Sequence, residues 1–283
     1  MKLSQEYRML ARRIASHIEL PAVHGLHLPH SVEEAEKPDE FGFVFLEDGS
    51  VGPFYTSLDD SLPRLWHRYP DPSALRTEPL SLIERFGSDD RAESALALGA
   101  WNAISQHLMK RAGFSPSAAS TSTASTGIGQ PAAGERVGMV GYFCPLVERL
   151  LEKGVQVLVV EKKPERVEIV EGVDLAATPA ELAHCDQVLC TASTLINDSL
   201  EDILKHSRGC GRFSLIGPSG SGLPDLLFER GVDSVGGIEF TDLDALHEAL
   251  AEQVSWGHAG HKYQLTPDRY PGVGELLRRA RRR

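Results

Sequence analysis

The chain has 283 residues, a length that fits two domains of ordinary size better than a single small one. With 41% hydrophobic and 24% charged residues, its composition is globular and excludes extensive disorder, collagen and coiled coil. The excess of 40 acidic over 29 basic side chains gives a net charge of -11, which repels a phosphate backbone and argues against nucleic acid as a partner.

The first part of the chain predicts a small α+β domain. In chain order we expect an amphipathic helix, two strands and a long helix, over 7–18, 22–28, 41–46 and 91–111. Pro21 ends the first helix, and Asp48-Gly49 predicts a hairpin turn, because glycine adopts positive φ at little steric cost. A helix, an antiparallel sheet and further helices make up this unit.

A change in composition at residues 115–133 predicts a linker. The segment SPSAASTSTASTGIGQPAA contains small polar residues, Gly and Pro in place of any hydrophobic pattern. Such a stretch buries too little apolar surface to offset the entropy of ordering it. We therefore predict domains at 1–114 and 134–283, joined by a Ser/Ala/Thr-rich linker at 115–133.

The second part alternates short apolar runs with helical segments. The runs lie at 137–140, 155–160, 187–190, 213–216 and 233–238. This alternation is typical of a parallel sheet covered on both faces. We predict a Rossmann-like doubly wound α/β domain, in which ligands bind beyond the carboxyl ends of the strands.

Two strand ends can be compared with a dinucleotide-binding site. In the loop GYFCPL only Gly141 matches the G-x-G-x-x-G pattern, while Phe143 and Leu146 occupy the other glycine positions. Phe143 obstructs the approach of a pyrophosphate, so ordinary NAD binding is disfavoured. Glu161 lies where a ribose-binding acid would stand, although an exposed strand-end carboxylate explains it equally well.

Two further loops are rich in polar groups. The segment CTASTLINDSL, residues 190–200, contains more hydroxyl and amide groups than capping of the next helix requires, which indicates a ligand. The segment GPSGSG, residues 217–222, could hold an anion with its backbone N–H groups, or form a simple glycine-rich turn.

These motifs, in this order, resemble the uncharacterised prokaryotic family labelled "putative heavy-metal chelation". The similarity is carried by RVGMVGYFCPLVERL, Glu161, CTASTLIND and SLIGPSGSGLPDLLFERGVDSVGG, and LEDGSVG and ALALGAWNAIS resemble its partner domain, which has an enolase amino-terminal-like fold. The resemblance implies a cleft between the two domains. It implies these ligand-binding residues: Gly141, Tyr142, Glu161, Thr191, Thr194, Asn197, Pro218, Ser219 and Asn102.

The chain departs from the family pattern at several positions. Ala192, Ser193 and Asp198 stand where the family has Gly, Thr and Gly, and Cys144 is not a family residue. Asp198 adds a charge beside the expected site, so we expect the ligand of this member to differ.

The residues do not form an obvious metal site. His24, His27 and His30 cannot share one face of a strand, where alternate side chains point in opposite directions, although a loop could gather them. The pair His258 and His261 is a similar candidate. We interpret the four cysteines as free thiols, with Cys185 and Cys190 acting as small apolar groups and Cys144 as a packed thiol at a helix start.

The strand-end loops offer oxygen ligands, which suit a hydrated cation, an anion or a polar small molecule better than a thiophilic metal. Our leading hypothesis is a protein that binds a transition-metal ion, a metal-chelate or a polar small molecule in the interdomain cleft. The alternatives are an enzyme that uses a nucleotide-type cofactor and an interaction subunit with a vestigial cleft. We expect a cytoplasmic protein without a membrane span; a homo-oligomer and a partner for the arginine-rich tail at 278–283 are left open.

Overall fold

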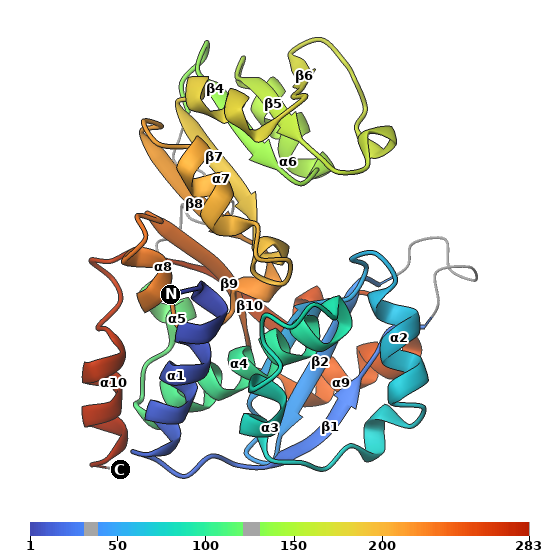
Figure 1. Cartoon of the computed structure of the whole chain (residues 1–283), viewed down its shortest axis with the longest axis vertical. Coiled ribbons are helices and arrows are strands. Elements are labelled where there is room, and N and C mark those ends of the chain that lie inside the picture. Colours follow the sequence, from blue (N-terminus) through green and yellow to red (C-terminus); the bar gives the residue numbers. More distant parts are fainter. Residues whose placement is uncertain (31–38, 121–130, 283) are drawn as a thin grey trace.

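The computed structural model describes residues 1–30, 39–120 and 131–282. It contains a small antiparallel sheet and a larger, mostly parallel sheet, whose strands β4–β6 lie far from α1 and α10 (Figure 1). The predicted fold class, a parallel α/β sheet preceded by a smaller α+β region, is confirmed. Among the described residues, no helix is both long and apolar enough to cross a membrane.

The small sheet has the order β1-β2-β3, with both pairs antiparallel. The elements of this region are α1 (Leu3–Ala15), β1 (Val23–His27), β2 (Phe41–Leu46), β3 (Val51–Tyr55), α2 (Ser61–Arg68), η2 (Pro72–Ala74), α3 (Pro79–Ile83) and α4 (Arg91–Arg111). Asp48 accepts a hydrogen bond from the Ser50 backbone N–H at 3.0 Å, which fixes the predicted hairpin turn.

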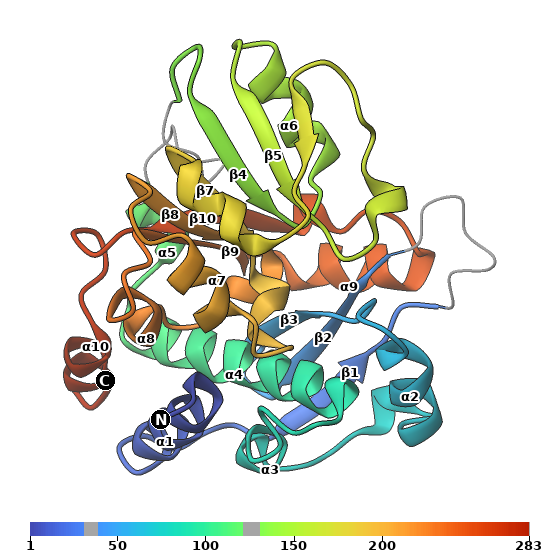
Figure 2. The ribbon, with the colours of Figure 1, turned by 45° about the horizontal axis from the view of Figure 1, so that its top comes forward.

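Helix α4 packs directly on β3. It begins where the Asp90 carboxylate accepts a hydrogen bond from the Ala92 N–H at 3.0 Å, and almost its whole length is buried. The close approach depends on glycine, because a Cβ on Gly52 would lie 1.9 Å from the Gly99 carbonyl oxygen. The helix therefore lies against the backbone of the strand (Figure 2).

The larger sheet has the order β10-β9-β8-β7-β4-β5-β6, with β10 antiparallel and the other strands parallel. When the six parallel strands are numbered along the chain, their order across the sheet is 3-2-1-4-5-6, which is the order found in dinucleotide-binding sheets. The elements are β4 (Arg136–Val140), α6 (Cys144–Leu151), β5 (Gln156–Val160), η3 (Pro164–Arg166), β6 (Val173–Leu175), η4 (Pro179–His184), β7 (Gln187–Thr191), η5 (Ala192–Leu195), α7 (Leu200–His206), β8 (Arg212–Ile216), η6 (Pro218–Gly220), α8 (Asp225–Phe228), β9 (Ser234–Phe240), α9 (Leu243–Glu252), η7 (Gly257–Ala259), β10 (Gly260–Leu265) and α10 (Val273–Ala280).

Both faces of the parallel sheet are covered. Val157 and Val159 of β5 pack in one apolar cluster with α6, whereas Leu158 between them belongs to the main core. This alternation explains the unbroken apolar runs in the sequence, because each face of the strand is buried.

Part of the predicted linker is ordered. Helix α5 (Pro116–Ala119) packs on β10, and Ser115 and the Ser117 N–H donate hydrogen bonds to the Glu239 carboxylate at 2.8 and 3.1 Å. The first residues of the predicted linker are therefore held by the packing of this short helix and by these two hydrogen bonds. Residues 121–130 of the predicted linker lie outside the described residues.

The hydrophobic core continues across the linker position. The main cluster contains residues of α1 and α4 together with residues of β7 and β8. A second contact packs Phe43 and Phe45 of β2 against Leu246 and Leu250 of α9. The two sheets thus share buried apolar surface, which fixes their relative position.

Candidate functional site

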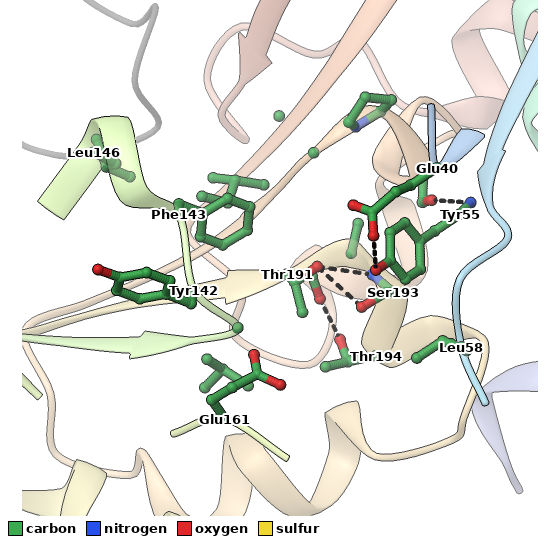
Figure 3. A pocket seen from close by; sticks show the side chains of 18 of the residues that line it. Glu40, Tyr55, Leu58, Tyr142, Phe143, Leu146, Glu161, Thr191, Ser193 and Thr194 are labelled. Carbon is green, nitrogen blue, oxygen red and sulfur yellow. Dashed lines mark hydrogen bonds between the residues drawn. The ribbon is translucent and has the colours of Figure 1, made fainter. Parts of the chain in front are cut away.

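A cavity of about 930 Å³ lies at the carboxyl ends of β4, β5, β7 and β8. The strand-end loops form one wall, and Glu40, Tyr55 and Leu58 of the amino-terminal region form the opposite wall. Figure 3 shows Tyr142 and Glu161 on one side of this space and Tyr55 and Glu40 on the other. In sheets of this strand order, ligands bind at such a position.

The first loop leaves β4 at a glycine that the backbone requires. Gly141 has φ of +85°, and its N–H donates a hydrogen bond to the Val160 carbonyl at 2.9 Å. A Cβ there would lie 3.2 Å from the Thr191 side chain, so the loop after β4 packs closely on the end of β7. Phe143 and Leu146 line the cavity where a dinucleotide fold has glycine, as the sequence indicated.

The loop after β7, residues 190–200, satisfies most of its polar groups by hydrogen bonds within the loop. Thr191 and Ser193 share a hydrogen bond at 3.0 Å, and the Thr194 hydroxyl donates to the Thr191 carbonyl at 2.7 Å. Asn197 accepts a hydrogen bond from the Ser199 N–H at 3.1 Å. Hydrogen bonds within the loop thus satisfy part of the excess of polar groups over helix capping, and the partly exposed Thr191, Ser193 and Asn197 line the cavity.

The loop after β8 is held against the amino-terminal region by buried and partly buried hydrogen bonds. The Ser219 hydroxyl accepts from the Tyr55 N–H at 2.9 Å. The Asn102 side-chain amide donates to the Pro53 and Ser219 carbonyls at 2.7 and 3.0 Å. Asn102 is fully buried, and therefore supports the cavity wall from behind without facing the cavity.

Across the cavity, charged side chains from distant segments meet. The Tyr55 hydroxyl donates to Glu40 at 3.0 Å, and Arg166 of η3 forms an ion pair with Glu40 at 3.9 Å. Burial, followed by the charge of Glu40, raises the pKa of Tyr55 to about 12, so this phenol stays protonated near neutral pH. Arg166 thereby links the loop after β5 to the opposite wall.

Eight of the nine predicted ligand-binding residues lie along this one cavity: Gly141, Tyr142, Glu161, Thr191, Thr194, Asn197, Pro218 and Ser219. Asn102 lies behind its wall. Asp198, expected to add charge beside the site, lies between the lining residues Asn197 and Ser199; it is exposed, does not itself line the cavity and lies 3.9 Å from the Lys2 ammonium. Asp198 adopts a left-handed φ of +55°, and the chain lines the cavity again at Ser199 and Asp202.

Sequence reasoning missed Glu40, Tyr55 and Arg166. Glu40 and Arg166 are not part of any sequence motif, and the contact between them depends on how the two regions pack. Trp256, two residues before His258, lines the cavity, and its indole N–H donates a hydrogen bond to Asp39 at 2.7 Å. His258 and His261 beside it are exposed.

The described residues contain no group of three His, Cys, Asp or Glu side chains that could hold a metal ion. His24 and His30 are exposed, whereas His27 packs beside Phe43. Cys185 and Cys190 are buried as expected, and burial raises the pKa of the Cys190 thiol to about 12. Cys144 is exposed at the start of α6, which corrects the expectation of a packed thiol.

The fold and cavity define a mixed α/β protein with a ligand-sized space at the ends of its parallel strands. Residues 128–266 match the model of the family DUF364, described as "Putative heavy-metal chelation". It is 26% identical over 164 residues to an uncharacterised protein of Methanocaldococcus jannaschii, an alignment that covers 57% of this chain and 60% of that relative.

Two solved structures of family members with unknown function share the fold. One from Pyrococcus horikoshii is 20% identical with a TM-score of 0.68, covering 93% of this chain and 99% of that one. One from Desulfitobacterium hafniense is 22% identical with a TM-score of 0.64, covering 93% and 98%.

Proposed function

We propose that the protein binds a metal already held by an organic chelator, or a polar small molecule of that kind, in the cavity between its amino-terminal region and the strand-end loops. The cavity itself carries this proposal. Its volume of about 930 Å³ is far larger than a bare ion requires and suits a small-molecule ligand.

The side chains favour a chelate over a bare ion. The described residues offer no cluster of soft or acidic ligands for a metal, so an incoming metal would bring its own donor atoms. Hydroxyl and amide groups such as those of Thr191, Ser193 and Asn197 are suited to hydrogen bonds with a polar chelator.

The charge of the cavity supports an anionic ligand. Its lining contains four basic and three acidic side chains: Arg149, Lys162, Arg166, Lys262, Glu40, Glu161 and Asp202. In a chain of net charge -11, this balance makes the cavity more positive than the molecule as a whole. Polycarboxylate chelators carry the matching charge.

We assign the two walls to two units, an amino-terminal domain at 1–114 and a Rossmann-like domain at 134–283. In this arrangement the ligand contacts are those predicted from the sequence, and Asn102 acts from behind Ser219. Glu40, Tyr55 and Arg166 extend the site on the amino-terminal side.

Thermal unfolding tests the proposal. The midpoint is measured with Ni²⁺, Co²⁺ or Zn²⁺ alone, with citrate or nitrilotriacetate alone, and with each metal complex. We expect a metal complex in large excess over its Kd to raise the midpoint by about 5 °C, because it binds only the folded state. No shift with any complex, or equal shifts with free metals, would contradict the proposal.

A variant pair locates the binding. Arg166→Gln removes a cavity cation and should abolish most of the shift, whereas Arg208→Gln removes an exposed cation outside the cavity and should leave the shift unchanged. Equal shifts in the two variants would place the ligand elsewhere.

A nucleotide-type cofactor is the second candidate, supported by the strand order and by Glu161 at the end of β5. Phe143 in the first loop argues against a pyrophosphate in its ordinary place. Native mass spectrometry of the freshly purified protein separates the candidates, because a retained nucleotide and a retained metal-chelate add different masses.

A further inference from the structure

A second, smaller hollow of about 320 Å³ lies between α1 and α10 and shares no residue with the cavity. Both views show these two helices side by side, with the carboxyl end of α10 beside α1 (Figures 1 and 2). The side chains that form the hollow come from both ends of the chain: Arg13, His17, Leu277, Arg278, Arg281 and Arg282. The structure therefore joins the arginine-rich tail to a second basic segment, which the sequence did not reveal.

The arginines extend from backbone segments that are anchored in the core. Helix α10 buries Leu276, Leu277 and Ala280, and α1 buries Ala11 and Ile14 in the main core. The packing of these helices places Arg13, Arg278, Arg281 and Arg282 around one hollow despite the mutual repulsion of like charges.

The hollow has a surplus of positive charge that its neighbours do not balance. Among the described residues, its lining includes no acidic side chain, and Arg13, Arg281 and Arg282 form no ion pair. Arg278 shares Glu275 with Arg279, at 2.5 and 2.7 Å. Two helix carboxyl ends contribute about one negative charge in total, which does not offset four guanidinium groups.

We propose that this hollow binds a phosphate-bearing anion. Guanidinium groups match phosphate oxygens with paired hydrogen bonds, and several of them converging from two helices would contact separate oxygens of one ligand. The same chemistry occurs in a soluble phosphate compound and in a phospholipid headgroup. The site is independent of the cavity and of the function proposed for it.

Pyrophosphate binding to the full chain, measured by calorimetry at low ionic strength, tests the site. The variant R13Q/R281Q removes one arginine of α1 and the arginine that directly follows α10. We expect its affinity for pyrophosphate to fall about tenfold or more, because charge-assisted hydrogen bonds are lost. The matched control R12Q/R279Q removes the same charge from adjacent arginines that are paired with Glu84 and Glu275, and should lose less than about threefold.

A second experiment measures how the full chain and the same variants bind to vesicles of phosphatidylglycerol and to vesicles of phosphatidylcholine. Binding of pyrophosphate that depends on Arg13 and Arg281 supports a soluble ligand, and binding of phosphatidylglycerol vesicles alone with the same dependence supports a headgroup. The proposal is overturned if neither probe binds, or if both variant pairs weaken binding equally. Unfolding midpoints without ligand verify that each variant is folded.

Discussion

At the scale of single residues, Asn102 shows how a buried side chain can determine the shape of a site that it does not contact. Its amide nitrogen joins Pro53 of β3 to Ser219 of η6, while its side-chain oxygen is buried without a hydrogen-bond partner in the described structure. The family resemblance placed Asn102 among the ligand-binding residues. Its role in the structure is to position Ser219, because helix α4 carries it behind the wall.

Replacing Asn102 by Ala should destabilise the protein by about 2–4 kcal/mol, because two buried carbonyl groups lose their donor. The free energy of unfolding in urea measures the effect. Asn197→Ala is the matched control, since this partly exposed amide contacts only its own loop, and it should cost less than about 1 kcal/mol. Equal losses in the two variants would contradict the role assigned to Asn102.

His27 makes stability depend on pH. Burial, with smaller contributions from His30 and His247, lowers the pKa of His27 to about 4 in the folded protein, below its ordinary value of 6.5. The unfolded chain therefore binds this proton first as the pH falls. The free energy of unfolding should be unaffected by His27 above pH 6.5 and should fall by up to about 3 kcal/mol between pH 6.5 and pH 4.

Urea denaturation of His27→Gln at pH 7 and pH 4.5 tests this pH dependence. Relative to the wild type, the variant should gain about 2 kcal/mol or more at the lower pH. His24→Gln, on the same strand but exposed, should follow the wild type at both pH values. A His27→Gln variant with unchanged pH dependence would show that this histidine does not titrate as described.

At the scale of elements, residue periodicity and turn residues predicted most of the structure. The helix expected over 91–111 is α4 with the same bounds, and the strand expected over 41–46 is β2. By contrast, β6 and β10 were not predicted. β6 has only three residues, and β10 reads GHKYQL, whose polar residues lie at an antiparallel edge where the neighbouring strand supplies the hydrogen bonds.

The contact between β3 and α4 depends on Gly52, so Gly52→Ala should cost at least about 2 kcal/mol, since the new Cβ would overlap the backbone of α4. Gly274→Ala provides a control in which the expected change in stability has the opposite sign. It adds a methyl group to α10 where nothing lies within 4 Å, and should stabilise the protein by about 0.5–1 kcal/mol. Thermal unfolding of both variants measures the effects, and a neutral Gly52→Ala would contradict this packing.

At the scale of the whole molecule, the sequence indicated where polar loops gather but not what faces them. The strand ends could be predicted because parallel strands place their carboxyl ends at one edge of the sheet. The opposite wall could not, because Glu40 and Tyr55 reach it through long-range packing of Phe43 and Phe45 against α9. Local patterns carry no information on such contacts.

The shared core predicts a single cooperative unfolding transition for the full chain, in spite of the two sheets. Calorimetry checks this through the ratio of the calorimetric to the van't Hoff enthalpy, which should be close to one. Phe43→Ala, at the contact with α9, should lower the midpoint of this single unfolding transition without dividing it into two transitions. Two separate transitions in the wild type would show that the halves unfold independently.

The unequal attachment of the cavity walls determines how a ligand can enter. Near β8 the walls are joined by the buried hydrogen bonds of Ser219 and Asn102, whereas near β5 they are joined by the ion pair between Arg166 and Glu40. An exposed ion pair separates at little energetic cost, but buried hydrogen bonds do not. We therefore expect a ligand to enter beside Arg166, where an arriving anion would compete with Glu40 for the guanidinium group.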